Sequence, residues 1–125
     1  MAEKKKILLV DDDEVSLAMA EKMLMNEYEV STVKSGKEAL NFLTQKYVPD
    51  LLLLDILMPE MDGWETFRNI KGISLLKDVP IAFLTSVDEA AEEKRAYQMG
   101  AVDYIKKPYA KKELLERVKL LLEKK

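Results

Sequence analysis

The chain has 125 residues, with 20 basic and 23 acidic side chains and a formal net charge of −3. It contains neither histidine nor cysteine, which excludes a zinc finger, a thiol nucleophile and a Ser-His-Asp triad. The length fits one ordinary domain whose core needs no disulfide. The acidic balance argues against general nucleic-acid binding, so any chemistry falls to carboxylates, lysines, hydroxyls and a bound metal ion.

No apolar run approaches the ~20 residues that a membrane-spanning helix needs. The apolar stretch at 7–10 follows three lysines, but it is too short for the core of a signal peptide, and acidic residues follow it. We therefore expect a cytoplasmic protein that begins directly with a strand. Residues 1–125 are expected to form a single domain without an output domain.

Five short apolar runs predict strands, at residues 6–10, 28–33, 51–54, 81–84 and 102–105. Continuous runs of this kind are typical of strands covered on both faces, as in parallel sheets. The four leucines at 51–54 could also be helical. The Pro49-Asp50 pair before them and the turn-rich MPEMDG sequence after them favour a strand.

Helix signals fill the stretches between these runs. Residues 14–26 form the first predicted helix, with Val15, Ala18, Met19 and Met23 near one face. Its apolar residues recur at helical spacing, which predicts that this face packs against the core.

Capping boxes mark the second and fourth predicted helices. Ser35 and Glu38 predict a helix start, and the same spacing recurs at Ser86 and Glu89. Gly100 is expected to end the fourth helix at its C-terminus.

Two further helices follow from apolar spacing. Trp64, Phe67 and Ile70 recur every third residue and predict the third helix. The loop at 71–80 has room for an extra helical turn. The fifth helix follows Pro108 and carries an apolar stripe of Leu114, Leu115, Val118, Leu121 and Leu122.

Strand and helix thus alternate five times, which predicts an α/β fold with right-handed crossovers and a mostly parallel sheet. Five units are too few for an eight-fold barrel, which leaves an open, doubly wound sandwich. Ligands in such folds bind beyond the carboxyl ends of the strands. The polar residues directly after the runs are the acids at 11–14, Asp55, Thr85, Ser86, Lys106 and Lys107.

This convergence of acids, a hydroxyl and a lysine predicts a metal-assisted phosphoryl-transfer site. Bunched carboxylates repel one another unless a cation lies among them. Mg²⁺ suits this setting, because it takes one or two carboxylates and keeps other positions for water and phosphate oxygens. A lysine can pair with an anion, and a threonine hydroxyl can donate a hydrogen bond to it.

Each of these residues also has a structural interpretation when it is taken alone. The acids at 11–14 could cap the first helix, where the helix dipole favours negative charge. Asp55 could be a turn residue, Thr85 an ordinary strand end, Lys107 one of many lysines, and Tyr104 a half-buried strand aromatic. The functional interpretation depends on all of them falling at strand ends of one sheet.

The segments ILLVDDDE, PDLLLLDILMPEMDGWE, PIAFLTS and GAVDYIKKPY, in this order and spacing, closely resemble the receiver domain of two-component response regulators. The resemblance covers nearly the whole chain. It implies a flavodoxin-like sandwich with strand order 2-1-3-4-5. It also implies a cis peptide bond between Lys107 and Pro108.

The resemblance implies a role for each matching residue of the metal and phosphoryl site. Asp11 and Asp12 match the acidic pair that binds Mg²⁺, with Asp12 as the more direct ligand. Asp55 matches the phosphoacceptor and a metal ligand, and the backbone carbonyl of Leu57 matches another ligand. Thr85, Lys107 and the switch residue Tyr104 match the remaining functional positions, whereas Lys106 is out of register for the lysine's role.

A covalent signalling mechanism follows from this resemblance. Asp55 would take a phosphoryl group from a histidine kinase or a histidine phosphotransfer protein, with Mg²⁺ bound. Thr85 and Lys107 would move towards the phosphoryl group, and Tyr104 would turn inward. The face of the fourth helix, fifth strand and fifth helix would then change its preference for a downstream protein target. We expect no enzyme turnover beyond self-phosphorylation and slow self-dephosphorylation, and either a monomer or a phosphorylation-dependent dimer.

Two positions that tune hydrolysis in this family carry Leu57 and Val87 here. Neither side chain can hydrogen-bond an attacking water, and both can shield the acyl phosphate. The sequence therefore predicts slow self-dephosphorylation.

Three other interpretations remain open. Asp11 and Asp13 fit the nucleophile motif of haloacid-dehalogenase phosphatases, but no acidic pair follows Lys107 in the required form. The chain could be a receiver-like module that is never phosphorylated, but such a module would not need the complete set of site residues that is present here. The chain could also be the receiver half of a larger regulator.

Overall fold

The computed structural model describes residues 3–43 and 47–123 and has one parallel sheet with helices on both faces. The elements in chain order are β1 (Lys6–Val10), α1 (Glu14–Leu24), β2 (Glu29–Val33), α2 (Gly36–Leu43), β3 (Leu51–Leu54), α3 (Gly63–Lys71), the 3₁₀ turn η1 (Ser74–Leu76), β4 (Ile81–Thr85), α4 (Ala90–Met99), β5 (Asp103–Lys106) and α5 (Lys111–Glu123).

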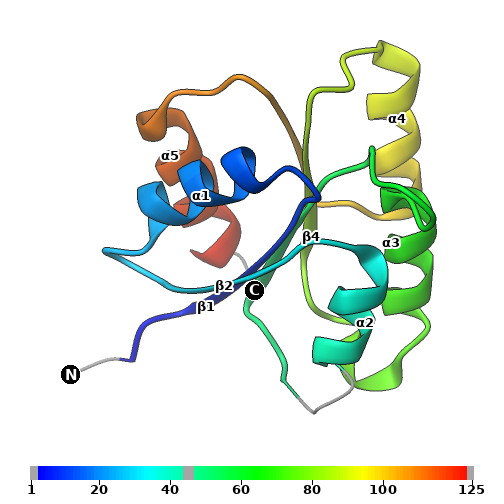
Figure 1. Ribbon diagram of the computed structural model, residues 1–125, viewed down its shortest axis with the longest axis horizontal. Helices are drawn as coiled ribbons and strands as arrows, with labels where there is room; N and C mark the ends of the chain where they lie inside the picture. Colours follow the sequence, from blue (N-terminus) through cyan, green and yellow to red (C-terminus); the bar gives the residue numbers. More distant parts are fainter. Residues whose placement is uncertain (1–2, 44–46, 124–125) are drawn as a thin grey trace.

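The sheet order is β2-β1-β3-β4-β5, and every paired strand is parallel. Helices α1 and α5 lie together on one side of the sheet, and α2, α3 and α4 lie on the other (Figure 1). The predicted doubly wound α/β fold and its strand order are therefore confirmed.

The central strands are apolar throughout because both of their faces are covered. Alternate residues of β1 contact opposite cores: Leu8 packs with the α2–α4 side, whereas Ile7 and Leu9 pack with the α1 and α5 side. All four leucines of β3 are buried, which explains why this run shows no alternation of polar and apolar residues.

An aromatic cluster fills the core between the sheet and helices α3 and α4. The Phe83 ring lies 5.0 Å from Trp64, 5.6 Å from Phe67 and 6.2 Å from Tyr104, measured between ring centroids. Separations of this size are typical of attractive aromatic pairs. The cluster joins α3 to the middle of β4 and β5.

The predicted strands agree with the structure to within one residue at each end. The extra helical turn expected at 71–80 is η1. The peptide bond between Lys107 and Pro108 is cis, as the resemblance implied.

The predicted core face of α1 is wrong for Val15, Ala18 and Met19, whereas half-buried Met23 does pack against the core. Val15 and Met19 are 67% and 54% exposed, whereas Leu17, Ala20 and Leu24 are buried against the sheet. The helix has apolar residues on more than one side, and those at 17, 20 and 24 share a stripe of helical spacing. The position of α1 on the sheet decides which stripe becomes core.

One of the two predicted capping boxes forms. At α2, the Ser35 hydroxyl accepts a hydrogen bond from the backbone N–H of Glu38 at 3.0 Å. The Glu38 carboxylate accepts one in turn from the backbone N–H of Lys34 at 2.9 Å. At α4 the expectation is wrong, because the helix begins at Ala90 after Glu89, and no side chain caps it.

This difference gives a matched pair of stability predictions. Ser35→Ala should lower the free energy of unfolding by about 1 kcal/mol, since it removes a formed N-terminal cap. Ser86→Ala should change it by less than about 0.5 kcal/mol, as expected for an exposed side chain without a cap bond. Urea denaturation of both variants measures these changes, and an equal loss for the two serines would contradict the assignment.

Within residues 3–43 and 47–123, the helices are too short and too polar to cross a membrane.

Candidate functional site

The candidate site lies at the carboxyl edge of the sheet, where the strand register brings the predicted residues together. Val10 pairs with Leu54 across β1 and β3, so Asp11 and Asp55 leave the sheet side by side. The Asp55 N–H donates to the Val10 carbonyl at 2.9 Å, which continues the ladder by one residue. At the other side of the site, the Lys107 N–H donates to the Thr85 carbonyl at 2.9 Å.

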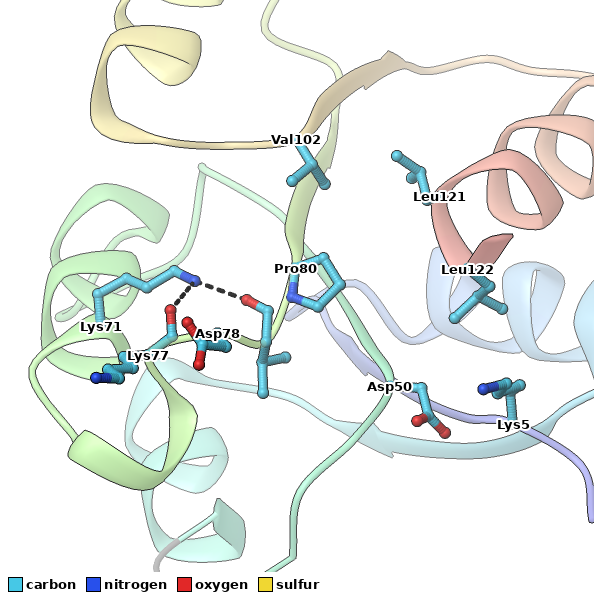
Figure 2. Close-up of a pocket in the computed structure, with 10 residues that line it drawn as sticks. Lys5, Asp50, Lys71, Lys77, Asp78, Pro80, Val102, Leu121 and Leu122 are labelled. Carbon is cyan, nitrogen blue, oxygen red and sulfur yellow. Dashed lines mark hydrogen bonds between the residues drawn. The ribbon is translucent and has the colours of Figure 1, made fainter. Parts of the chain in front are cut away.

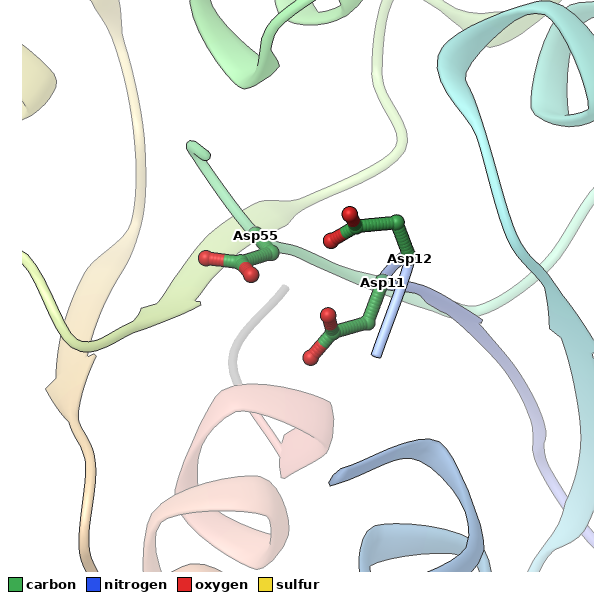
Figure 3. A group of neighbouring side chains, drawn as sticks. All are labelled: Asp11, Asp12 and Asp55. Atoms are coloured by element: carbon green, nitrogen blue, oxygen red, sulfur yellow. The ribbon is translucent and has the colours of Figure 1, made fainter. Parts of the chain in front are cut away.

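Three carboxylates gather at this edge. Asp11, Asp12 and Asp55 each offer an oxygen, and these oxygens lie within 4.8 Å of one another (Figure 3). Asp11 and Asp55 are each only 6% exposed, whereas Asp12 is open to solvent. The cluster therefore has a buried base and an accessible side.

Asp13 does not belong to this cluster and caps α1 instead. Its carboxylate accepts hydrogen bonds from the Val15 N–H at 3.0 Å and from the Ser16 hydroxyl at 3.1 Å. These bonds hold the pKa of Asp13 below its ordinary value. The helix-cap interpretation of the acids at 11–14 is thus right for Asp13, which leaves the pair before it for the site.

Lys107 is the cation that faces the cluster. Its Nζ lies 2.6 Å from Asp11 Oδ2 and 3.6 Å from Asp55 Oδ2. Although burial alone would lower the pKa of Lys107, its hydrogen bond with Asp11 and the charge of Asp55 raise that pKa above its ordinary value. The ammonium group is therefore fixed in its charged form between two buried carboxylates.

Negative charge at the cluster exceeds what this single ammonium offsets. Burial raises the pKa of Asp55, Lys107 opposes that rise, and the neighbouring charge of Asp11 adds to it. The donor set consists only of carboxylate oxygens, which suits a hard divalent cation with oxygen ligands. Asp11, Asp12 and Asp55 thus fit a Mg²⁺ ion, while the part of the Leu57 carbonyl in such a site stays a prediction.

Thr85 and Tyr104 are joined through the backbone of Val87. The Thr85 hydroxyl accepts a hydrogen bond from the Val87 N–H at 3.2 Å, and the Tyr104 hydroxyl donates to the Val87 carbonyl at 2.7 Å. Thr85 is fully buried and Tyr104 is 2% exposed. Burial raises the pKa of Tyr104 to about 12, so this hydroxyl is a neutral donor at physiological pH.

The inward position of Tyr104 differs from the expected sequence of events. The resemblance implied that this ring turns inward after phosphorylation, but it already packs against Phe83 and bonds to Val87. Lys106, the neighbour set aside as out of register, reaches away from the acidic cluster. Its Nζ lies 3.1 Å from Asp88 and 3.2 Å from Glu93.

Leu57 and Val87 line one groove beside the acidic cluster. Leu57 is 59% exposed and Val87 is half-buried. The groove has a volume of about 490 Å³ and runs between the loop after β3 and the loop after β4. The other residues that line it are Ile56, Asp62, Trp64, Ser86, Glu89 and Glu92.

Gly63 is a site residue that the sequence analysis did not single out. A Cβ atom at this position would lie 2.3 Å from the Asp55 carbonyl oxygen and 2.6 Å from the Ile56 Cα. The Gly63 N–H donates to the Ile56 carbonyl at 2.8 Å, so α3 begins directly against the backbone that carries Asp55. The turn-rich sequence before α3 was a signal for this close approach, since glycine permits it.

A separate pocket of about 540 Å³ (Figure 2) lies at the amino ends of the strands, the end opposite to that of the acidic cluster. Its Lys71 side chain donates to the carbonyls of Lys77 at 3.1 Å and Val79 at 2.6 Å, which ties α3 to the loop before β4. Asp50 accepts from the Lys6 N–H at 2.7 Å. These contacts are structural, so we place the functional site at the carboxyl edge.

The fold and the site define a doubly wound α/β protein. Its carboxylate cluster, paired with one lysine, lies at the carboxyl edge of the sheet. The family model of the response regulator receiver domain matches residues 7–119. The chain therefore belongs to this family, whose members are phosphoacceptor signalling domains of two-component systems and accept phosphate from histidine kinases. Receiver domains are signalling domains rather than enzymes in the ordinary sense.

Relatives and solved structures agree with this assignment. The response regulator MprA of Mycobacterium tuberculosis is 39% identical over 118 residues, which are 94% of this chain and 50% of MprA. A "probable cyclic di-GMP phosphodiesterase" of Vibrio cholerae is 40% identical over 95% of this chain and 27% of its own length. The V. cholerae chemotaxis protein CheY4 superposes with a TM-score of 0.88 at 30% identity, covering 95% of this chain and 99% of CheY4.

The chain thus spans between about a quarter and a half of these two curated relatives. The V. cholerae relative that is named a phosphodiesterase is nearly four times longer than the segment that matches this chain.

Proposed function

We propose that Asp55 is the phosphoacceptor of this receiver domain, with Thr85 and Lys107 acting on the phosphoryl group. The observation that carries this proposal is the buried Asp55 carboxylate at a strand end, with two more carboxylates within 4.8 Å and the Lys107 ammonium 3.6 Å away. Buried carboxylates grouped with one lysine are the parts that phosphoryl transfer needs.

The proposed donor is a phosphohistidine on a histidine kinase or a histidine phosphotransfer protein. An Asp55 carboxylate oxygen attacks phosphorus, the new O–P bond forms as the N–P bond breaks, and the electron pair of that bond stays on the imidazole nitrogen. Lys107 offsets the charge of the transferred group, and Thr85 donates a hydrogen bond to one of its oxygens. The chain has no histidine, so it acts as the aspartate partner and cannot supply the phosphohistidine.

Asp11, Asp12, Asp55 and the Leu57 carbonyl would hold Mg²⁺, which supplies positive charge for the acceptor and the transferred phosphoryl group. The geometry of the three carboxylates supports this ligand set. Lys107 would leave its 2.6 Å contact with Asp11 to make room for a cation, and it would then be free to approach the phosphoryl oxygens.

The proposed output is a change in partner preference at the face formed by α4, β5 and α5. The Thr85 hydroxyl would donate to the phosphoryl group while still accepting from the Val87 N–H, so its movement towards the phosphoryl group would pull on the backbone of Val87. Because Tyr104 bonds to the same residue, the loop and the switch ring would shift together. This is a population shift that favours a downstream protein target, with the domain either monomeric or dimeric after phosphorylation.

We place this function in the cytoplasm, without direct contact to nucleic acid or membrane. Residues 1–125 would form one receiver domain. The alternative, in which the chain is the receiver part of a larger regulator, is supported by the greater length of its curated relatives.

Acetyl phosphate with Mg²⁺ tests the proposed acceptor. Wild-type protein should gain one phosphoryl group by intact mass, and Asp55→Asn should gain none, because it lacks the attacking oxygen anion. The matched control is Asp13→Asn, which changes a nearby aspartate that caps α1 and replaces it with another good cap. This control should still gain the group, and an equal gain in Asp55→Asn would exclude Asp55 as the acceptor.

A further inference from the structure

A second groove opens between α3 and α4, which lie next to each other on one side of the sheet (Figure 1). Its volume is about 510 Å³. Phe67 lines it but is only 2% exposed, half-buried Met99 adds accessible apolar surface, and Arg68, Lys71 and Arg95 give it three cations. It is separate from the groove that contains Leu57 and Val87.

The charge of this groove contrasts with that of the whole chain. Its lining includes three cations and no carboxylate, although the chain as a whole has a net charge of −3. No described residue forms an ion pair with Arg68, which is exposed. Arg95 reaches Glu92 only at 3.9 Å, and Lys71 has one N–H left after its bonds to two carbonyls.

Arg95 is also held in a defined position. Its guanidinium lies 4.2 Å from the centroid of the buried Trp64 ring, which orients the planar group above the aromatic face. A guanidinium that is already ordered loses less entropy when it binds a carboxylate, and it can do so with two parallel hydrogen bonds. The groove therefore presents a prepared site for an anion beside an apolar surface.

Charge and shape limit what can occupy the groove. The neighbouring groove, between the two loops that lead into these helices, carries the carboxylates of Asp62, Glu89 and Glu92. An extended polyanion such as a nucleic acid would run into this negative surface. A second copy of the chain that bound through this face would present the same groove, and two identical grooves do not fill each other.

We infer that the α3–α4 groove binds a short acidic segment of a partner protein. Carboxylates of that segment would pair with Arg68 and Arg95, and one of its apolar side chains would contact Met99. Such a segment combines the two chemistries that the lining offers, an apolar surface flanked by helices and three cations. The inference concerns a surface that the phosphoacceptor chemistry does not use.

A fluorescently labelled peptide of alternating glutamate and leucine residues serves as the probe. Anisotropy should show saturable binding that weakens as salt is added. In Arg68→Gln/Arg95→Gln, affinity should fall by at least about tenfold, since two charge-assisted contacts are lost. Trp64, the single tryptophan, should change its emission when the peptide binds to the wild-type protein.

The matched control is Lys94→Gln/Lys119→Gln, which removes the same charge from two exposed lysines outside the groove. It should bind the peptide as the wild type does. If the arginine double variant does not fold by circular dichroism, Arg68→Gln alone gives the same comparison, because that side chain is exposed. Absence of peptide binding, or equal losses in the arginine and lysine variants, would overturn the inference.

Two other occupants are separate outcomes of the same experiment. Tighter binding of a labelled single-stranded oligonucleotide, lost in Arg68→Gln/Arg95→Gln, would replace the acidic peptide with nucleic acid. Self-association in sedimentation velocity that this variant abolishes would replace it with a second copy. Either result would contradict the proposed occupant.

Discussion

Leu57→Asn/Val87→Glu should lose its phosphoryl group about 10- to 100-fold faster than the wild-type protein, since a positioned polar group can orient or deprotonate the attacking water. Both wild-type side chains line the groove next to Asp55, and Leu57 is 59% exposed there. As purely apolar groups they neither bind nor activate a water molecule. We therefore predict a long-lived phosphorylated form for the wild type.

The rate can be followed by intact mass after acetyl phosphate is removed. Leu57→Met/Val87→Ile is the matched control, because it changes both residues but keeps the groove apolar, and it should decay at the wild-type rate. The prediction depends on Asp55 being the acceptor, which the mass gain of the wild type tests first. If the phosphorylated wild type decays as fast as the polar double variant, these two side chains do not protect the acyl phosphate.

The sheet could be predicted from the sequence because its strands are short, apolar and covered on both faces. The leucines of β3 and the run in β1 fall where the structure has them. The strand ends then determine which polar residues share an edge. For this reason the sequence could predict that Asp11, Asp55 and Lys107 lie close together, although they are far apart in the chain.

The predictions that were wrong concern α1 and the start of α4, where tertiary contacts decide between two structures that the local sequence permits equally. The sequence of α1 offers apolar residues on several sides, and only packing on the sheet selects Leu17 over Val15. Ser86 has the spacing of a cap, but α4 begins only at Ala90, and the backbone of Val87 before it is bound by the Thr85 and Tyr104 side chains. Side-chain bonds of this kind depend on rotamers, which a pattern of residue types does not specify.

The partner of Lys107 is a similar case, and it has a functional consequence. The sequence placed this lysine near the acidic cluster, while the structure adds that its shorter contact is to Asp11 rather than to Asp55. A cation bound by Asp11 would therefore compete with the ammonium group for the same carboxylate. Removing the lysine should separate its structural role from its role towards the metal.

Lys107→Ala should bind Mg²⁺ about tenfold more tightly than the wild type, within the usual range of coupling between two ligands of one site. It should also be less stable without Mg²⁺, by about 3 kcal/mol, because it leaves two buried carboxylates without their cation. Mg²⁺ should restore much of that loss, since a ligand of the folded state stabilises it. Calorimetric titration and urea denaturation, with and without Mg²⁺, measure these effects.

Lys106→Ala is the matched control for this experiment. It removes the neighbouring lysine, whose ion pairs with Asp88 and Glu93 are solvent-accessible and do not involve the acidic cluster, so Mg²⁺ affinity should stay at the wild-type value. Equal Mg²⁺ affinity in the wild type and in Lys107→Ala would show that the ammonium group does not compete with the cation. In that case the contact between Lys107 and Asp11 would be structural, and another residue would set the affinity of the acidic cluster.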